Sequence, residues 1–178
     1  MKNKKYTINL ITGSGIDELL KGVEDYKKWL KTKSEELLKR LTEEGYQIAS
    51  AGFSGAQYDG TNDSSVRVED RGDHAKAIVA VGSSVLFIEF GTGVTYPDSH
   101  PEAGQHGMVR GGYGQGKGKQ HTWGYYGYPG TNGVMRETKS GKSVVLTHGN
   151  PANMPMYEAV KQLRERLPEL VREVFGND

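Results

Sequence analysis

Apolar residues recur at helical spacing over a long stretch near the start of the chain. From Ile16 to Ile48 they are mostly three, four or seven positions apart, which predicts an amphipathic helix of about 35 residues. Ser14 is a candidate N-cap, and Asp17 and Glu18 fall in the first turn, where carboxylates favour the positive end of the helix dipole. An unbroken helix of this length spans roughly 50 Å, because each residue adds about 1.5 Å.

A second helical pattern lies near the end of the chain, from Pro155 to Val174. Asn153 can cap this helix, and Pro155 suits its first turn because the missing N–H is not needed there. Pro168 lies inside the pattern and cannot donate to the carbonyl of Arg164. We therefore expect a kink in the C-terminal helix.

Shorter runs between the two helices predict strands. Residues 66–69 and 75–81 alternate along the chain, and residues 134–138 and 143–147 flank a Lys-Ser-Gly-Lys turn. The first two runs predict single strands, and the other two predict a hairpin. The run 85–90 is largely apolar, but it is too short for periodicity to separate a strand from one or two helical turns.

Two further segments have weaker patterns. Residues 6–11 alternate weakly, which predicts a short edge strand, and residues 52–65 are rich in Gly, Ser, Asp and Asn, which predicts a loop. All the elements together predict an α+β fold in a single domain over residues 1–178. In it, a long N-terminal amphipathic helix and a kinked C-terminal helix pack on a small antiparallel sheet.

A glycine-rich arm is inserted at about residues 94–133. The stretch 91–133 holds 13 of the 25 glycines and few aliphatic residues, so it cannot bury enough apolar surface to order itself alone. The arm is basic, in a chain whose net charge is only +1. It could order against a neighbouring subunit, bind single-stranded nucleic acid by stacking and phosphate contacts, or form a solvated loop. The candidate contact residues of the arm are Tyr96, Arg110, Tyr113, Lys117, Lys119, Trp123, Tyr125, Tyr126 and Tyr128.

The residues that catalysis or metal binding would need are missing or badly spaced. There is no cysteine, which excludes disulfides, thiolate metal sites and a cysteine nucleophile. The two Gly-Lys pairs, at 116–117 and 141–142, lack the rest of a phosphate-binding loop. The histidines lie in loop-like sequence without the spacing of a zinc protease, so we expect them to be solvated. We expect no enzyme, no catalytic residues, no cofactor and no metal.

Glu89 is unusual as a carboxylate inside an apolar run. It could be an acid in a catalytic site, but we favour a structural role, either on the wet face of a strand or as an acceptor for backbone N–H groups of the glycine turn that follows it. A hydrolase site around Glu89 and His148 has no specific support. The longest apolar run, residues 85–88, is far too short to span a bilayer, so we expect no membrane partner and no signal peptide.

Two segments together carry a resemblance. Residues 87–93 read Phe-Ile-Glu-Phe-Gly-Thr-Gly, and residues 148–160 combine a Gly/Pro turn with a proline at the start of a helix. In this order they resemble the tail-completion family of tailed bacteriophages, which includes head–tail joining, neck and minor tail proteins. The residues that match the family's motifs are Glu89, Phe90, Gly91, Thr92, Gly93 and Pro155.

The resemblance implies a structural protein of the virion, with no reaction of its own. Such a subunit forms a homo-oligomeric ring, expected to be a hexamer, in the neck or tail of the particle. Its partners would be the portal-side connector and the tail tube or tail terminator protein, and the ring channel would have room for DNA. Assembly would take place in the cytoplasm of the bacterial host. The alternative function is a nucleic-acid-binding module that uses the basic arm.

Overall fold

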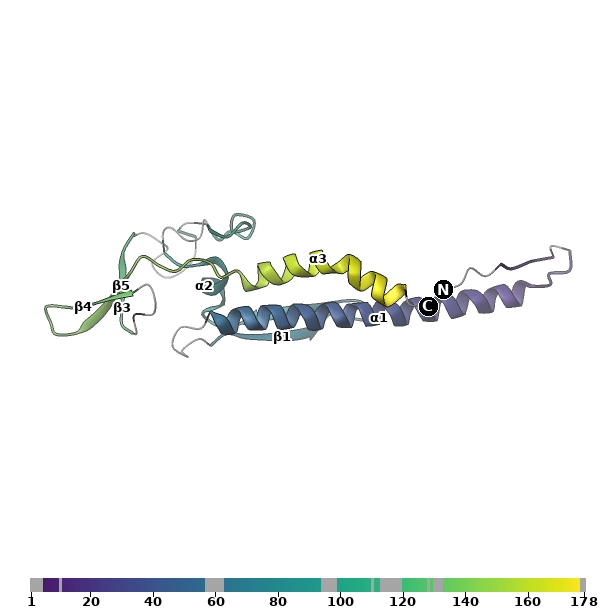
Figure 1. The fold of residues 1–178 in the computed structure, drawn as a ribbon, viewed down its shortest axis with the longest axis horizontal. Helices are drawn as coiled ribbons and strands as arrows, with labels where there is room; N and C mark the ends of the chain where they lie inside the picture. Colours follow the sequence, from purple (N-terminus) through teal and green to yellow (C-terminus); the bar gives the residue numbers. More distant parts are fainter. Residues whose placement is uncertain are drawn as a thin grey trace.

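The computed structural model describes residues 5–9, 11–56, 63–93, 99–109, 111–112, 120–127, 129 and 133–176. Its elements in chain order are α1 (Ile16–Gly55), β1 (Ser65–Asp70), β2 (Lys76–Val81), α2 (Val85–Phe90), β3 (Trp123–Tyr125), β4 (Gly133–Glu137), β5 (Ser143–Thr147) and α3 (Pro155–Phe175). The α+β fold, with a long N-terminal helix, a C-terminal helix and antiparallel strands, is confirmed (Figure 1).

The start of α1 differs from the prediction in its cap. Gly15, with a φ of 89°, is the N-cap residue, and Ser14 does not cap the helix. The left-handed conformation of Gly15 lets the preceding segment lie alongside α1. There the carbonyl of Thr7 fills the space that a side chain at Gly15 would need. Glycine adopts this conformation without steric cost. Asp17 and Glu18 lie in the first turn, as predicted.

The predicted edge strand at residues 6–11 is wrong. Its described residues, 6–9 and 11, form no strand. The backbone turns at Asn9, whose carbonyl accepts a hydrogen bond from the N–H of Gly13 at 2.8 Å. The side chain of Asn9 accepts another from the N–H of Ile11 at 2.9 Å. These local bonds use the polar groups that a strand would offer to a neighbour.

The C-terminal end of α1 reaches Gly55, inside the segment predicted as a loop from residue 52. The reason is tertiary packing. Phe53 is 2% exposed and belongs to the core, and Gly52 lets α3 come close, because a Cβ there would lie 2.6 Å from the Cβ of Pro155. Residues 57–62 of the predicted loop lie outside the described residues.

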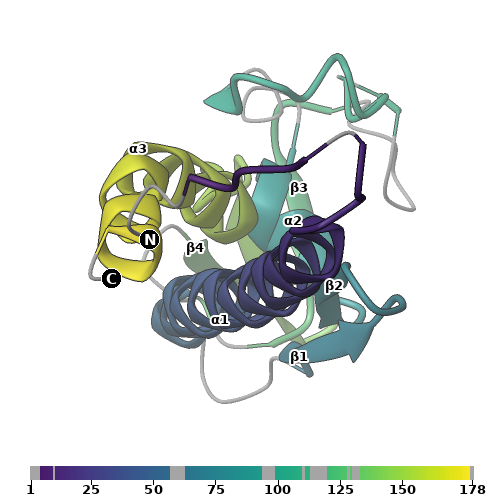
Figure 2. The ribbon, with the colours of Figure 1, turned by 90° about the vertical axis from the view of Figure 1, so that its right-hand side faces the viewer.

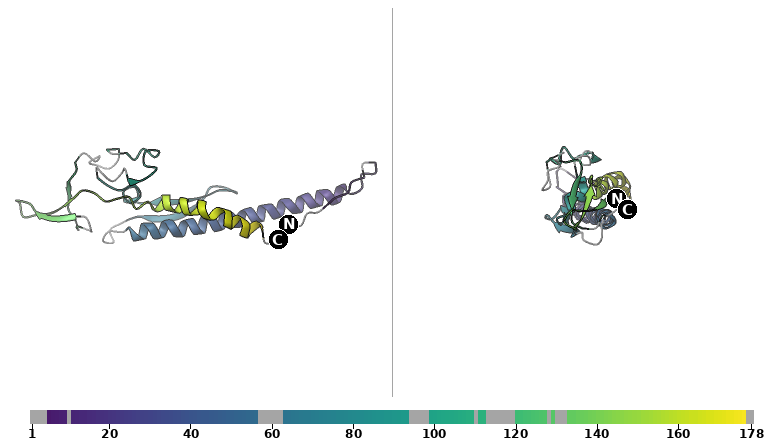
Figure 3. Two further views of the ribbon diagram at one scale, coloured as in Figure 1. Left: turned by 45° about the horizontal axis from the view of Figure 1, so that its top comes forward. Right: turned by 90° about the vertical axis from the view of Figure 1, so that its left-hand side faces the viewer.

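Helix α3 packs antiparallel along the C-terminal part of α1 (Figures 1 and 3). At one end Pro155 lies against Gly52, and at the other the rings of Phe175 and Trp29 lie 5.8 Å apart. Since α3 has 21 residues and α1 has 40, the N-terminal part of α1 projects beyond α3. Figure 2 shows α3 and the β1–β2 hairpin on different sides of α1.

The start of α3 also has a different cap from the predicted one. Met154, with a φ of 56°, is the N-cap residue, and its side chain makes no capping hydrogen bond. The predicted cap, Asn153, lies one residue before the N-cap position, and its N–H donates to the carbonyl of Ile88 at 2.9 Å. The helix continues through Pro168, and its axis bends in the second half, as the predicted kink requires (Figure 1).

The described strands form two separate antiparallel sheets where the sequence predicted one. The hairpin of β1 and β2 lies along α1, and β3, β5 and β4 form a three-stranded sheet in that order. The predicted hairpin of β4 and β5 is confirmed. Strand β3 comes from the predicted arm and pairs Trp123 with Thr147 and Tyr125 with Val145, so part of the arm is ordered against its own chain.

The core lies where α1, α2 and the β1–β2 hairpin meet. Phe53, Ala56 and Ile88 are its buried residues, and Val66 and Met156 are among those that pack around them. The ambiguous run 85–90 is the helix α2. Its helical geometry turns Ile88 into this core and leaves the next residue, a carboxylate, facing the start of α3.

Candidate functional site

The two segments that carry the resemblance lie side by side in the fold. The N–H of Thr92 donates to the carbonyl of Asn150 at 2.8 Å, and the N–H of Asn150 donates to the hydroxyl of Thr92 at 2.7 Å. A third bond, from Asn153 to Ile88, joins the same two segments. We call residues 88–93 and 148–157 the motif junction.

Glycines at the motif junction allow the two backbones to approach. Gly91, Gly93 and Gly149 have φ values of 82°, 85° and 98°, in a region that L side chains rarely adopt. A Cβ on Gly91 would lie 2.8 Å from the carbonyl oxygen of Asn150, and one on Gly149 would overlap the carbonyl of Thr92. The glycines of the motif are therefore required by the contact between the two segments.

Glu89 lies at the centre of the motif junction and caps α3 from a distance of 67 residues along the chain. Its two carboxylate oxygens accept hydrogen bonds from the N–H groups of Met156 at 2.8 Å and Tyr157 at 2.9 Å. N–H groups of the first helical turn have no partner within the helix, and a negative charge is favourable at that end. Pro155 fits at the first position because it has no N–H to satisfy.

His100 completes the surroundings of Glu89. Its Nε2 lies 3.3 Å from a carboxylate oxygen of Glu89, and the two side chains are 2% and 7% exposed. The N–H of Glu102 donates to Nδ1 of His100 at 3.1 Å, so in the neutral ring Nε2 carries the hydrogen and its N–H donates a hydrogen bond to the carboxylate of Glu89. The expectation of a solvated His100 is wrong, because the ring is packed between Phe90 and Tyr157 at 4.5 and 5.3 Å.

This arrangement supports the structural role favoured for Glu89, with different partners. The sequence suggested the N–H groups of the following glycine turn, whereas the structure places those of α3 against the carboxylate. His148, the other residue weighed for a hydrolase, bonds to the carbonyl of His121 and the hydroxyl of Thr122. Within the described ranges, no three His, Asp or Glu side chains gather to hold a metal ion.

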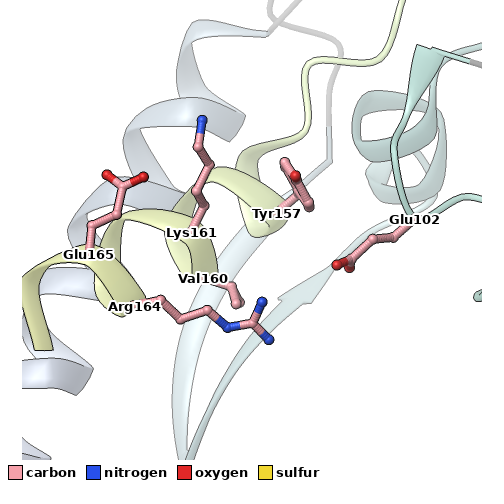
Figure 4. A pocket seen from close by; sticks show the side chains of 6 residues that line it. All are labelled: Glu102, Tyr157, Val160, Lys161, Arg164 and Glu165. Carbon is pink, nitrogen blue, oxygen red and sulfur yellow. The ribbon is translucent and has the colours of Figure 1, made fainter.

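A shallow hollow lies beside the motif junction, on the outer face of α3 (Figure 4). Its volume is about 190 Å³, below the 300–1,000 Å³ or so that is usual for small-molecule sites. Figure 4 shows Arg164 extending from α3 toward the side of Glu102. The hollow is lined by Glu102, Tyr157, Val160, Lys161, Arg164 and Glu165.

Three of the nine arm candidates fall in the described part of the chain. The rings of Trp123 and Tyr125 lie 5.6 Å apart on β3 and are half-buried, while Tyr126 is 73% exposed. The structure thus brings two of the aromatic candidates together. The others, Tyr96, Arg110, Tyr113, Lys117, Lys119 and Tyr128, lie outside the described residues.

The sequence did not reveal Asp63, which anchors the start of α2. Its carboxylate accepts hydrogen bonds from the N–H groups of Ser83 at 2.8 Å and Ser84 at 3.2 Å. These bonds, first that of Ser83 and then that of Ser84, hold the pKa of Asp63 below its ordinary value. The residues are 20 positions apart along the chain, so no local pattern could have predicted the contact.

Comparison of the chain with protein-family models, with curated proteins and with solved structures found no match. Within the described part of the chain, no helix is both long enough and apolar enough to cross a membrane.

Proposed function

We propose that the protein is a structural subunit of a tailed-phage virion, a neck or tail-completion adaptor without catalytic activity. In this proposal copies of the chain form a ring that joins the head-side connector to the tail tube. The resemblance of residues 87–93 and 148–160 to that family motivates the assignment, and both segments take part in one contact. The motif therefore has a physical role in this chain, which is to hold the start of α3.

The observation that carries the proposal of an assembly subunit is the exposed surface. The chain exposes 12,340 Å², whereas a compact monomer of its mass, 19.6 kDa, is expected to expose about 8,600 Å². The described part of the chain is elongated, with α1 projecting at one end and the β3–β5–β4 sheet at the other (Figures 1 and 3). Such a surface suits a chain that is covered by neighbours in its working state.

Apolar side chains are exposed at both ends of the molecule. On β4, Val134 and Met135 are 58% and 53% exposed, and at the projecting end of α1, Leu20 and Val23 are 56% and 55% exposed. Two unlike apolar surfaces on one chain suit head-to-tail contacts, which close into a ring when the rotation between subunits allows it. This supports a ring over an isolated subunit.

The test is the mass and shape of the purified full-length protein. Size-exclusion chromatography with light scattering should give a mass of more than two chains, independent of salt, and negative-stain electron microscopy should show rings. A folded monomer at every concentration that can be reached would contradict the proposal. Retention of single-stranded DNA that falls steeply with added salt, together with a monomeric mass, would instead support the nucleic-acid-binding module.

A further inference from the structure

Residues 5–9 run beside the N-terminal part of α1, where Tyr6 packs against Gly22, but they leave an apolar seam of this helix largely exposed (Figure 1). Ile16, Leu20, Val23 and Leu30 are between 40% and 56% exposed, and their spacing of four, three and seven places them on one side of the helix. Residues this exposed and this regularly spaced are unusual on a helix surface that faces only water.

The exposed seam is continuous with an established contact. Seven residues after Leu30 the same side of the helix reaches Leu37, which is half-buried, and then Gly45, where Leu163 of α3 packs closely. The seam is thus mostly apolar along α1, interrupted by Lys27 and Ser34, and α3 covers only its C-terminal part. Because α3 ends where Phe175 meets Trp29, the remaining part presents the same apolar side without a partner helix.

Charges beside the exposed seam alternate in sign. Asp17, Lys21, Glu24 and Lys28 are four, three and four positions apart, which places them along one flank of the seam. All four side chains are exposed. Within the described part of the chain, none of them forms an ion pair, whereas Lys31 and Lys39 further along α1 do.

We propose that the projecting part of α1 pairs antiparallel with the same segment of a second copy, about a two-fold axis near Val23. An alignment that places Val23 opposite its copy also places Ile16 opposite Leu30, so apolar residues meet apolar residues. If one helix is shifted along the other by one residue from that alignment, Asp17 lies opposite Lys28. Opposite charges along the flank then face each other, which favours this pairing over its alternatives.

The charge order decides the orientation of the pair. In a parallel pair the two-fold axis runs along the helices, so this charged flank faces the opposite flank of the partner, and the pairs of Asp17 with Lys28 and of Lys21 with Glu24 do not form. In the antiparallel pair Lys21 also lies opposite Glu24, so both kinds of ion pair occur twice around the two-fold axis. The contact is closed and isologous, unlike the head-to-tail contacts of a ring, and does not rest on the proposed function.

Charge exchange tests the pairing on the full-length protein. One variant, Asp17→Lys with Glu24→Lys, makes the flank all basic, and another, Lys21→Glu with Lys28→Glu, makes it all acidic. Each variant alone should raise the dissociation constant of the pair by roughly tenfold or more. At protein concentrations below this raised constant, the mass measured by sedimentation should fall to half. Mixing the two variants should restore the mass. As a control, Glu18→Lys with Asp25→Lys changes the same charge on the opposite side of the helix and should leave the mass unchanged.

Cysteine cross-linking tests the orientation, and the chain has no native cysteine to interfere. A chain carrying Ile16→Cys, mixed with one carrying Leu30→Cys, should form a disulfide between the two. Ile16→Cys alone should not cross-link, because antiparallel pairing separates the two copies of position 16 by about 21 Å, well beyond the roughly 7 Å limit of a disulfide.

The outcomes separate this inference from the proposed function. Cross-linking of Ile16→Cys with itself would show a parallel contact and overturn the antiparallel pair, as would charge variants that keep the mass of the native protein. Rings without any cross-link through α1 would overturn the pair and leave the adaptor proposal intact. A particle of only two chains with the 16–30 cross-link would support the pair and contradict the ring.

Discussion

Glu89 is the residue through which the motif junction acts on the fold. It is a buried carboxylate whose two oxygens bind the first free N–H groups of α3 and whose third neighbour is the imidazole of His100. Three donors around one carboxylate satisfy the charge without water, which is the condition under which a buried charge is tolerated. The residue holds together segments from three separate parts of the chain.

Replacement of Glu89 by glutamine should therefore lower the free energy of unfolding. The amide offers one acceptor oxygen and turns an NH₂ group toward a backbone N–H, so we expect a loss of about 1–3 kcal/mol. Urea denaturation followed by circular dichroism measures it. Glu165→Gln, at an exposed position of α3, is the matched control and should change stability by less than about 0.5 kcal/mol. Equal effects of the two changes would show that Glu89 does not anchor α3.

Gly91 is the second residue on which the motif junction depends. Its φ of 82° and ψ of −179° lie in a region that is essentially restricted to glycine, and other residues there cost about 1–3 kcal/mol. A Cβ would also press on the carbonyl of Asn150. We expect Gly91→Ala to lower the melting temperature, measured by differential scanning calorimetry.

The control for this change is Gly55→Ala. Gly55 is helical, and a Cβ there would meet no atom within 4 Å. Alanine at such a position stabilises by about 0.4–1 kcal/mol, because the unfolded chain loses freedom and helix propensity rises. The two glycine changes should thus shift the melting temperature in opposite directions. A shift of the same sign would contradict the assigned role of Gly91.

Among the elements, the short helix α2 depends most on distant residues. It has six residues, too few to be stable alone. Asp63 binds the backbone just before it, and Ile88 fixes its inner side in the core. The turn after it is closed by Gly91. The helical conformation of this run is thus a consequence of contacts at both of its ends.

The role of Asp63 predicts a pH dependence. Because hydrogen bonds lower its pKa in the folded state, its contribution to stability is full above the pKa of the unfolded chain and is lost as the pH falls through the lower, folded value. Asp63→Asn should be less stable than the native protein at neutral pH, and the difference should shrink in acid. Unfolding free energies measured across that range test this. The exposed Asp73→Asn is the control, and a difference that persists in acid would refute the role.

At the scale of the whole molecule, the chain is long and thin, with little core for its size. Ten apolar residues in the described part are buried, and they are spread along the molecule from Ala49 to Val174. Both ends expose apolar side chains. The predicted ring and the predicted α1 pair belong to this scale, and they compete for the same surface, because the exposed Leu20 and Val23 of α1 take part in both.

Much of the fold could be predicted from the sequence because it is written in local patterns. The seam of α1 and that of α3 repeat every three or four residues, and this periodicity predicts a helix whatever lies beside it. The hairpin of β4 and β5 follows in the same way from its turn residues. The candidate site could be predicted only in part: Glu89 was assigned a structural role, with the wet face of a strand and the binding of backbone N–H groups as alternatives, and its partners on α3 were not predicted.

The tertiary structure alone decided which distant groups meet. The helical form of residues 85–90, the cap at Met154 and the burial of His100 all depend on residues far away along the chain. Sequence periodicity reports which side of an element avoids water, and this is why the elements of this protein were predictable. The closure of hydrogen bonds between segments about 60 residues apart depends on the path of the whole chain, and only the folded structure contains that information.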